Sequence, residues 1–153
     1  MGIEQDIHQP KFKNEYQRAS VNLLFTYGWL MERIKKLLAQ EDVTPQQFNI
    51  LRILRGSHPE PLSTLQIRDR LLDKMSDTSR IVDRLITKGL VKKAVCKKDL
   101  RLVDVSITDK GRKLLEKLDI KEHEIDGFLG NLTEKEATTL SDLLDKIIRI
   151  DRK

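Results

Sequence analysis

The sequence predicts a mainly α-helical protein with one small β-hairpin, and three observations lead to this fold class. Apolar residues recur at helical spacing through most of the 153 residues, and the runs begin at residues that commonly cap helices. After Gly89 the apolar spacing changes from about 3.6 residues to 2, which indicates strands. Residues 84–101 contain seven basic side chains and one acid, so this stretch carries +6, whereas the whole chain carries +5.

Two helices are predicted before the charged stretch. From about residue 16 to 40, two adjacent rows of apolar residues at helical spacing indicate a long amphipathic helix. Thr44 then opens a second helix, because Pro45 suits the first helical position and Gln47 completes a Thr-x-x-Gln capping box. The run at residues 56–61, which contains glycine and two prolines, ends that helix.

A helix-turn-helix and a hairpin come next. A capping box at Ser63 opens a short helix, and a second helix is expected from Ser76 to Lys88, with Gly89 at its end. Residues 90–95 and 102–107 are rich in β-branched side chains, so we expect two strands joined by a polar, basic turn. A helix-turn-helix followed directly by such a hairpin is a winged helix-turn-helix, in which the hairpin is the wing.

The chain then returns to helices. Thr108 caps one helix, which Gly130 and Asn131 break, and Thr133 opens the last helix with a Thr-x-x-Glu capping box. We expect residues 44–108 to form a winged helix-turn-helix lobe, and residues 1–43 and 109–153 to form a helical dimerisation region. The terminal helices carry more apolar surface than a monomer of this layout could cover, and a C2 homodimer would cover it.

The basic stretch predicts binding to double-stranded DNA, because its charge is focused on the second helix of the motif and on the wing. Small hydroxylated residues at a helix N-terminus fit the major groove, and basic residues farther along reach phosphates or a guanine edge. An arginine at the wing tip is narrow enough for a minor groove. The candidate contacts are Ser76, Thr78, Ser79, Arg80, Arg84, Lys88, Lys97, Lys98, Asp99 and Arg101.

Other interpretations of these residues stay open. Ser76 and Asp77 could simply cap their helix, and Asp77 would repel a phosphate. Asp99 and Arg101 could form a plain polar turn. Cys96 is the single cysteine, so no intrachain disulfide can form; neighbouring lysines could lower its pKa and make it a redox sensor, or it could be an incidental strand residue.

Residues from about 54 to 111 resemble the MarR family (multiple antibiotic resistance regulators). The resemblance rests on the order and spacing of short motifs: residues 62–65, Ser79 to Leu85, Lys88 to Val91, the Asp99-Leu100-Arg101 wing and residues 105–111. It implies a homodimeric DNA-binding regulator that is released from DNA by a small phenolic or lipophilic effector. By position, Arg101 would be the minor-groove arginine and Asp99 its support.

The remaining features argue against other classes of protein. Aromatic residues are only 5% of the chain, which disfavours a stacking platform for single-stranded nucleic acid. No catalytic motif, metal-ligand spacing or cofactor motif is present, so we expect neither an enzyme nor a bound cofactor. No segment has the pattern of a signal peptide or of a bilayer span, so we expect a cytoplasmic protein that does not use a membrane. The main alternative is a winged helix that docks proteins without reading DNA.

Overall fold

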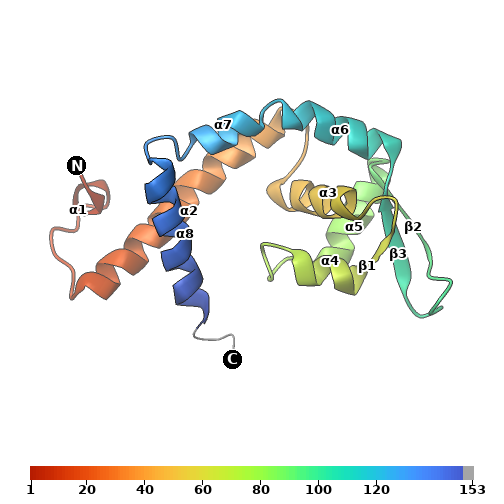
Figure 1. Ribbon diagram of the computed structural model, residues 1–153, viewed down its shortest axis with the longest axis horizontal. Helices are drawn as coiled ribbons and strands as arrows, with labels where there is room; N and C mark the ends of the chain where they lie inside the picture. The colour runs from red at the N-terminus through yellow and green to blue at the C-terminus, as the bar shows by residue number, and fades with distance from the viewer. Residues whose placement is uncertain (150–153) are drawn as a thin grey trace. The chain divides into compact units, whose positions relative to one another are not determined.

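The computed structural model describes residues 1–149 and shows a mainly helical chain with one small sheet (Figure 1). By compactness the chain divides into two units, Met1–Arg112 and the part from Lys113 onward. The predicted division into a lobe at 44–108 and a flanking helical region stays a prediction. The elements are α1 (Ile3–Asp6), α2 (Glu15–Ala39), α3 (Pro45–Ser57), β1 (Leu62–Ser63), α4 (Thr64–Arg70), α5 (Thr78–Thr87), β2 (Val91–Val95), β3 (Val103–Ile107), α6 (Asp109–Asp119), α7 (Glu122–Gly127) and α8 (Glu134–Ile148).

The three predicted capping boxes are confirmed. The hydroxyl of Thr44 accepts from Gln47 N at 3.1 Å, and the Gln47 side chain accepts from Thr44 N at 3.3 Å. The same reciprocal pattern opens α4 at Ser63 and α8 at Thr133. Each box satisfies two backbone donors that the first turn of a helix leaves unpaired, so these helix starts could be read from the sequence.

The predicted boundaries fail at three places. The second helix of the motif was expected from Ser76, but α5 begins at Thr78 because Asp77, not Ser76, is the N-cap. The helix expected from Thr108 to Gly130 is two helices, α6 and α7, separated at residues 120–121. Neither α1 nor the two-residue strand β1 was predicted, since each is too short to show an apolar period.

The sheet has the strand order β1-β3-β2, and both pairs are antiparallel. In the hairpin, Val91 lies opposite Ile107 at the base and Val95 lies opposite Val103 near the tip. Val91 and Ile107 are buried, whereas Lys92 to Val95 are exposed. The base of the wing therefore packs in the core, and its tip extends into solvent.

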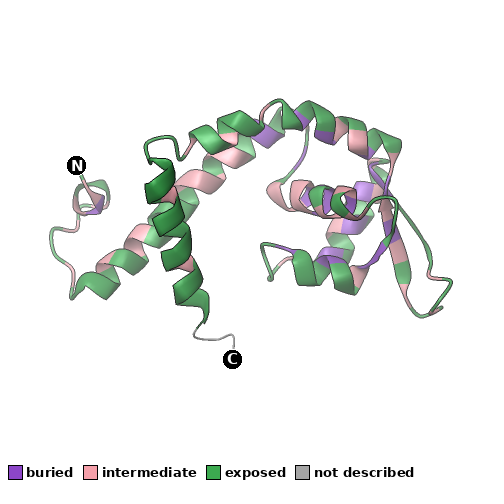
Figure 2. Ribbon diagram, in the orientation of Figure 1, coloured by how far each residue is buried: buried purple, intermediate pink, exposed green. Residues whose placement is uncertain are grey.

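The core of the first unit lies around α3, which contacts α2, α4, α5 and β3 (Figure 2). Its most deeply buried side chains include Ile50, Leu51, Leu54, Ile67 and Leu85, each at most 1% exposed. Burying one such side chain contributes about 1.5–3 kcal/mol, so this cluster holds the two helices of the motif in a fixed relation. That relation positions the candidate site.

Two other helices leave apolar side chains uncovered. On α2 the exposed large apolar residues are Tyr16, Leu23, Leu24, Phe25 and Tyr27. On α8 they are Leu140, Leu143, Ile147 and Ile148. Figure 2 shows α8 almost entirely exposed. Separately, within residues 1–149, none of the helices has the length and apolarity that a bilayer span requires.

Candidate nucleic-acid interface

The helix-turn-helix is held by local caps and by one contact from α3. Asp77 Oδ1 accepts from Arg80 N at 3.2 Å and caps α5. In the turn, Asp73 Oδ1 accepts from Met75 N at 3.0 Å. The side-chain oxygen of Asn49 on α3 accepts from Leu72 N at 2.9 Å and ties the turn to the core. The negative charge of Asp77 is thus explained: it satisfies a backbone donor at a helix start, where a carboxylate is also favoured by the helix dipole.

One side of α5 is polar and open to solvent. Ser79, Arg80 and Arg84 are exposed, while Val82 and Leu85 on the opposite side are buried in the core. Within residues 1–149, neither guanidinium has an ion-pair partner in the structure. Unpaired, solvated guanidinium groups on a helix face can bind phosphates or guanine edges without first breaking an internal contact.

Two residues at the start of α5 do not fit the predicted role. Thr78 is only 5% exposed, and its hydroxyl is buried with no hydrogen-bond partner in the described part of the chain. Its side chain faces the core, so we remove Thr78 from the candidate interface. Ser76 is half-buried and lies before the helix, so it is not in the first helical turn as predicted. Ser79 is the exposed hydroxylated residue in that turn.

The wing tip carries a preformed arginine. Arg101 donates from Nε to Asp99 Oδ1 and from Nη2 to Asp99 Oδ2, both at 3.1 Å, and Asp99 Oδ1 also accepts from Arg101 N at 3.0 Å. The side-chain hydrogen bonds from Arg101 lower the pKa of the Asp99 carboxyl from its ordinary value, and the backbone hydrogen bond from Arg101 lowers it further by a smaller amount. The Arg101 side chain is still 89% exposed. The arginine is therefore held by its neighbour while most of its side chain stays exposed to solvent.

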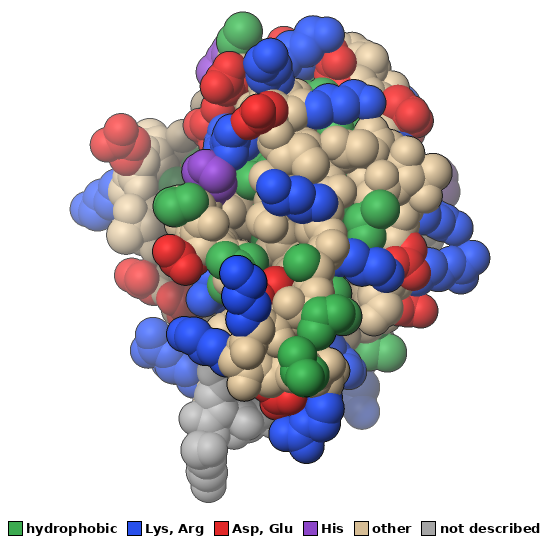
Figure 3. Space-filling model, turned by 90° about the vertical axis from the view of Figure 1, so that its right-hand side faces the viewer, with side chains coloured by type: hydrophobic (Ala, Val, Ile, Leu, Met, Phe, Trp, Pro, Cys, Tyr) green, Lys and Arg blue, Asp and Glu red, His purple; other side chains and the backbone are tan. Residues whose placement is uncertain are grey.

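The lysines of the wing differ in their surroundings. Lys97 and Lys98 are exposed at the tip. Lys93 Nζ lies 3.3 Å from Asp83 Oδ1 and ties β2 to α5. Lys92 lines a polar groove of about 560 Å³ at the wing base, together with His58, Ser106 and Arg112. Lys and Arg side chains are spread over the wing side of the molecule (Figure 3).

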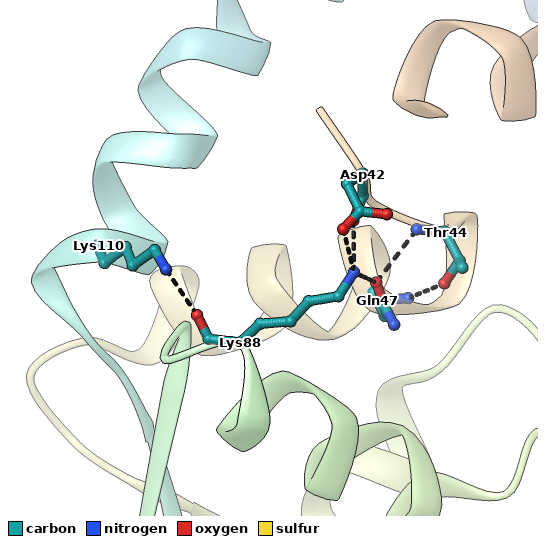
Figure 4. A network of polar contacts seen from close by, with 5 residues as sticks. All are labelled: Asp42, Thr44, Gln47, Lys88 and Lys110. Atoms are coloured by element: carbon teal, nitrogen blue, oxygen red, sulfur yellow. Dashed lines mark hydrogen bonds and ion pairs between the residues drawn. The ribbon is translucent and has the colours of Figure 1, made fainter. Parts of the chain in front are cut away.

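Lys88 was predicted to contact phosphate, but its amine is engaged within the protein (Figure 4). Lys88 Nζ donates to the backbone oxygen of Asp42 and, at 3.1 Å, to Gln47 Oε1. The side chain is only 29% exposed. We therefore leave Lys88 out of the candidate interface. The contacts of Lys88 with Asp42 and Gln47 could not be predicted from the sequence, because these partners are 46 and 41 residues away from it.

Cys96 lies in the loop after β2 as a half-buried free thiol, and its redox role stays a prediction. No cluster of three or more His, Cys, Asp or Glu side chains that could hold a metal occurs within residues 1–149.

Comparison with known proteins identifies the family. A sequence model of the MarR family matches residues 41–102. The chain is 31% identical to the HTH-type transcriptional regulator TtmR of Methylorubrum extorquens over 71% of its own length, but it spans only 55% of that relative. It is 31% identical to the HTH-type transcriptional repressor MdtR of Bacillus subtilis, over 72% of this chain and 70% of that one.

The fold agrees with that result. A solved MarR transcription factor from Planctomyces limnophilus is 33% identical, with a TM-score of 0.65 over 92% of this chain and 97% of that chain. The family model covers the helix-turn-helix and the wing up to Leu102, which includes the Asp99–Arg101 pair. The predicted resemblance is therefore confirmed: the chain belongs to the MarR family of winged helix-turn-helix, DNA-binding transcriptional regulators.

Proposed function

We propose that this chain is a homodimeric repressor that binds a pseudo-palindromic operator through α5 and the wing. In each subunit the N-terminal half of α5 enters the major groove, where Ser79 and Arg80 reach base edges or phosphates and Arg84 binds phosphate. The wing lies along the adjacent minor groove, with Lys97 and Lys98 close to the backbone. A repressor is the role named for one relative, MdtR.

The observation that carries the proposal is the paired Asp99 and Arg101 at the wing tip. A guanidinium that is 89% exposed and already oriented by two hydrogen bonds loses little side-chain entropy when it binds. The negative potential of a narrow minor groove is strongest over A·T tracts and attracts arginine. Asp99 Oδ1 also accepts from Arg101 N, as aspartate does in many polar turns, so the two side-chain hydrogen bonds to the guanidinium are what favour a binding role.

The homodimer is supported by the uncovered apolar faces of α2 and α8. Each helix has large apolar side chains that are at least 55% exposed: Leu143 and Ile147 on α8, and Leu24 and Tyr27 on α2. Exposed apolar faces of this kind commonly mark a protein–protein interface. A second copy would bury these faces and present two α5 helices about one DNA turn apart, roughly 34–36 Å. Sedimentation of the protein alone should give the mass of a dimer at micromolar concentration.

The decisive experiment is a salt titration of binding to DNA from upstream of the protein's own gene, beside a shuffled duplex of the same composition. We expect tight, specific binding, and we expect the logarithm of the association constant to fall linearly with the logarithm of the salt concentration. Equal affinity for the two duplexes would reject the operator-binding function and favour the alternative, a winged helix that docks proteins. A phenolic or lipophilic effector stays a prediction of the family resemblance, and addition of salicylate to the same titration would test it.

A further inference from the structure

The C-terminal end of α5 is fixed by a lysine that points back into the protein. Lys88 is the C-cap residue of α5, and its ammonium group reaches the turn between α2 and α3. There it donates to the backbone oxygen of Asp42 and to Gln47 Oε1, and it lies 3.6 Å from Asp42 Oδ2. These three oxygens come from one short segment, so the end of α5 is attached to a defined point.

The segment that receives Lys88 is itself rigid. Gln47 is 4% exposed, and its side-chain oxygen accepts from both Thr44 N and Lys88 Nζ, at 3.3 and 3.1 Å. Asp42 adopts a left-handed backbone conformation with φ of 54°, which aspartate tolerates better than most residues. Asp42 follows the last turn of α2 closely, and Val43, which is 4% exposed, anchors the segment in the core.

The other side of the same helix end is held by the start of α6. Lys110 Nζ donates to the backbone oxygen of Lys88 at 2.8 Å (Figure 4). The Thr108 hydroxyl donates to the backbone oxygen of Gly89 at 2.7 Å. The carbonyls of Lys88 and Gly89, which directly follow the last residue of α5, are thus occupied, and a cation near a helix C-terminus is favoured by the helix dipole. The end of α5 is therefore held between the α2–α3 turn and the first turn of α6.

We infer that Lys88 is a positioning residue for DNA recognition: its contact with Asp42 and Gln47 sets the orientation of α5, so sequence-specific binding depends on a turn that does not touch DNA. The inference rests on the proposed function. A helix of ten residues is about 15 Å long, so Lys88 lies at the opposite end of α5 from the residues proposed to enter the groove. A small rotation at this end would displace Arg80 at the other.

The first test replaces Lys88 by methionine, which keeps the unbranched apolar stem and removes the ammonium group. We expect affinity for operator DNA to fall about tenfold, because α5 loses the contacts that set its orientation and the folded protein must use part of its binding free energy to restore that orientation. Affinity for shuffled DNA and the salt slope should stay unchanged, because no phosphate contact is removed. Lys113→Met is the control, because it removes the same charge from an exposed position. The DNA affinities of both variants are calculated from the concentration of folded, binding-competent protein.

The second test uses two variants of Asp42 that carry the same charge. Asp42→Gly permits the left-handed conformation and loses only the carboxylate. Because the Asp42 side chain is 97% exposed, its carboxylate contributes little to the attraction of Lys88. Asp42→Val disfavours that conformation and displaces the carbonyl that accepts from Lys88. We expect Asp42→Val to lower operator affinity as Lys88→Met does, and Asp42→Gly to keep the wild-type affinity.

The outcomes separate the inference from the proposed function. If the wild-type protein shows no preference for operator DNA, the proposed function fails. If the wild-type protein is specific but Lys88→Met weakens operator and shuffled DNA alike and lowers the salt slope by about 0.9 for each Lys88 removed, Lys88 is a phosphate contact and the inference fails. Equal operator affinities for Asp42→Val and Asp42→Gly, or a loss of stability alone in Lys88→Met, would also overturn it.

Discussion

The wing tip and the C-terminal end of α5 belong to the same basic stretch, but they use positive charge in opposite ways. At the tip, Arg101 is held by Asp99, two residues away, and keeps 89% of its side chain exposed. At the end of α5, Lys88 is held by residues 41 and 46 positions away and keeps only 29% exposed. The charge at the tip is therefore exposed to solvent, whereas the charge at the end of α5 is bound within the protein.

The difference shows what a run of basic residues means in a fold. The sequence locates the charge, but the tertiary structure decides which side chains are free. In this stretch Lys93 is paired with Asp83 and Lys88 with the α2–α3 turn, while Arg84 remains open to solvent. Variants at these two places should therefore fail in different ways.

The first turn of α6, which packs against the backbone just after α5, should not tolerate a larger side chain at Gly111. A Cβ on Gly111 would lie 2.3 Å from the backbone oxygen of Leu90 and 2.7 Å from Ile107 Cγ1, so Gly111→Ala must shift backbone. We expect the free energy of unfolding to fall by about 2–3 kcal/mol, the upper part of the range for overpacking. Chemical denaturation measures this. Gly56→Ala is the control, since nothing lies within 4 Å of the added atom, and a similar loss there would contradict the geometric explanation.

The wing tip should be tolerant of truncation for stability but not for binding. Arg101→Ala is expected to weaken operator binding by about 2 kcal/mol, roughly thirtyfold, with the largest loss at half-sites flanked by A·T pairs. The unfolding free energy should hardly change, because the side chain is exposed. Fluorescence anisotropy with labelled operator measures the binding, beside Lys135→Ala, an exposed lysine of α8. Equal losses in the two variants would show a charge effect without a specific wing contact.

The start of α5 should depend on its cap. Asp77→Ala removes the acceptor for Arg80 N and is expected to lower the free energy of unfolding by about 1 kcal/mol. Asp77→Asn, which retains an acceptor oxygen, should restore most of that loss in thermal or chemical denaturation. If both variants are equally unstable, the role of Asp77 is electrostatic and not that of a hydrogen-bonding cap.

The smallest effect is expected at Asp99. Asp99→Asn weakens the support of Arg101, and we expect operator affinity to fall by about 1 kcal/mol or less, the cost of ordering one long side chain. An explanation by net charge alone predicts the opposite sign, because the variant loses a negative charge near DNA. A binding titration therefore decides between preorganisation and simple repulsion.

The pH dependence of this contact has a defined direction. The pKa of Asp99 is lowered from 3.8 by the hydrogen bonds from Arg101. A lowered pKa means that the contact is complete above the ordinary value and is lost only as the pH falls through the folded-state value. The wing contact should therefore persist throughout the neutral and mildly acidic range, which the chemical shifts of the Arg101 side chain would report.

The sequence was informative wherever the deciding contact is local. The capping boxes at Thr44, Ser63 and Thr133 and the place of Gly89 at the end of α5 depend on neighbours within a few residues, and each was predicted correctly. The predicted start of α5 was wrong by two residues: Ser76 and Asp77 are both residues that commonly cap helices, and the structure has Asp77 as the cap.

The candidate site was predicted less completely than the fold, for the same reason. The exposure of Arg80, Arg84 and Arg101 agrees with their expected roles, whose contacts with DNA remain predictions. The burial of Thr78 and the inward direction of Lys88 could not be read from the sequence, because they depend on how α5 packs against α3 and on the turn that precedes α3.

The salt dependence of operator binding by Arg101→Ala and Lys88→Met, measured in one series with the wild-type protein, tests the central comparison most directly. For Arg101→Ala we expect the slope of log K against log salt to become less steep by about 0.9 for each Arg101 removed, because that charge releases counterions at the DNA. For Lys88→Met we expect the wild-type slope, with a lower affinity for operator DNA only. Identical changes in slope for the two variants would contradict the assignment of one charge to DNA and the other to the protein interior.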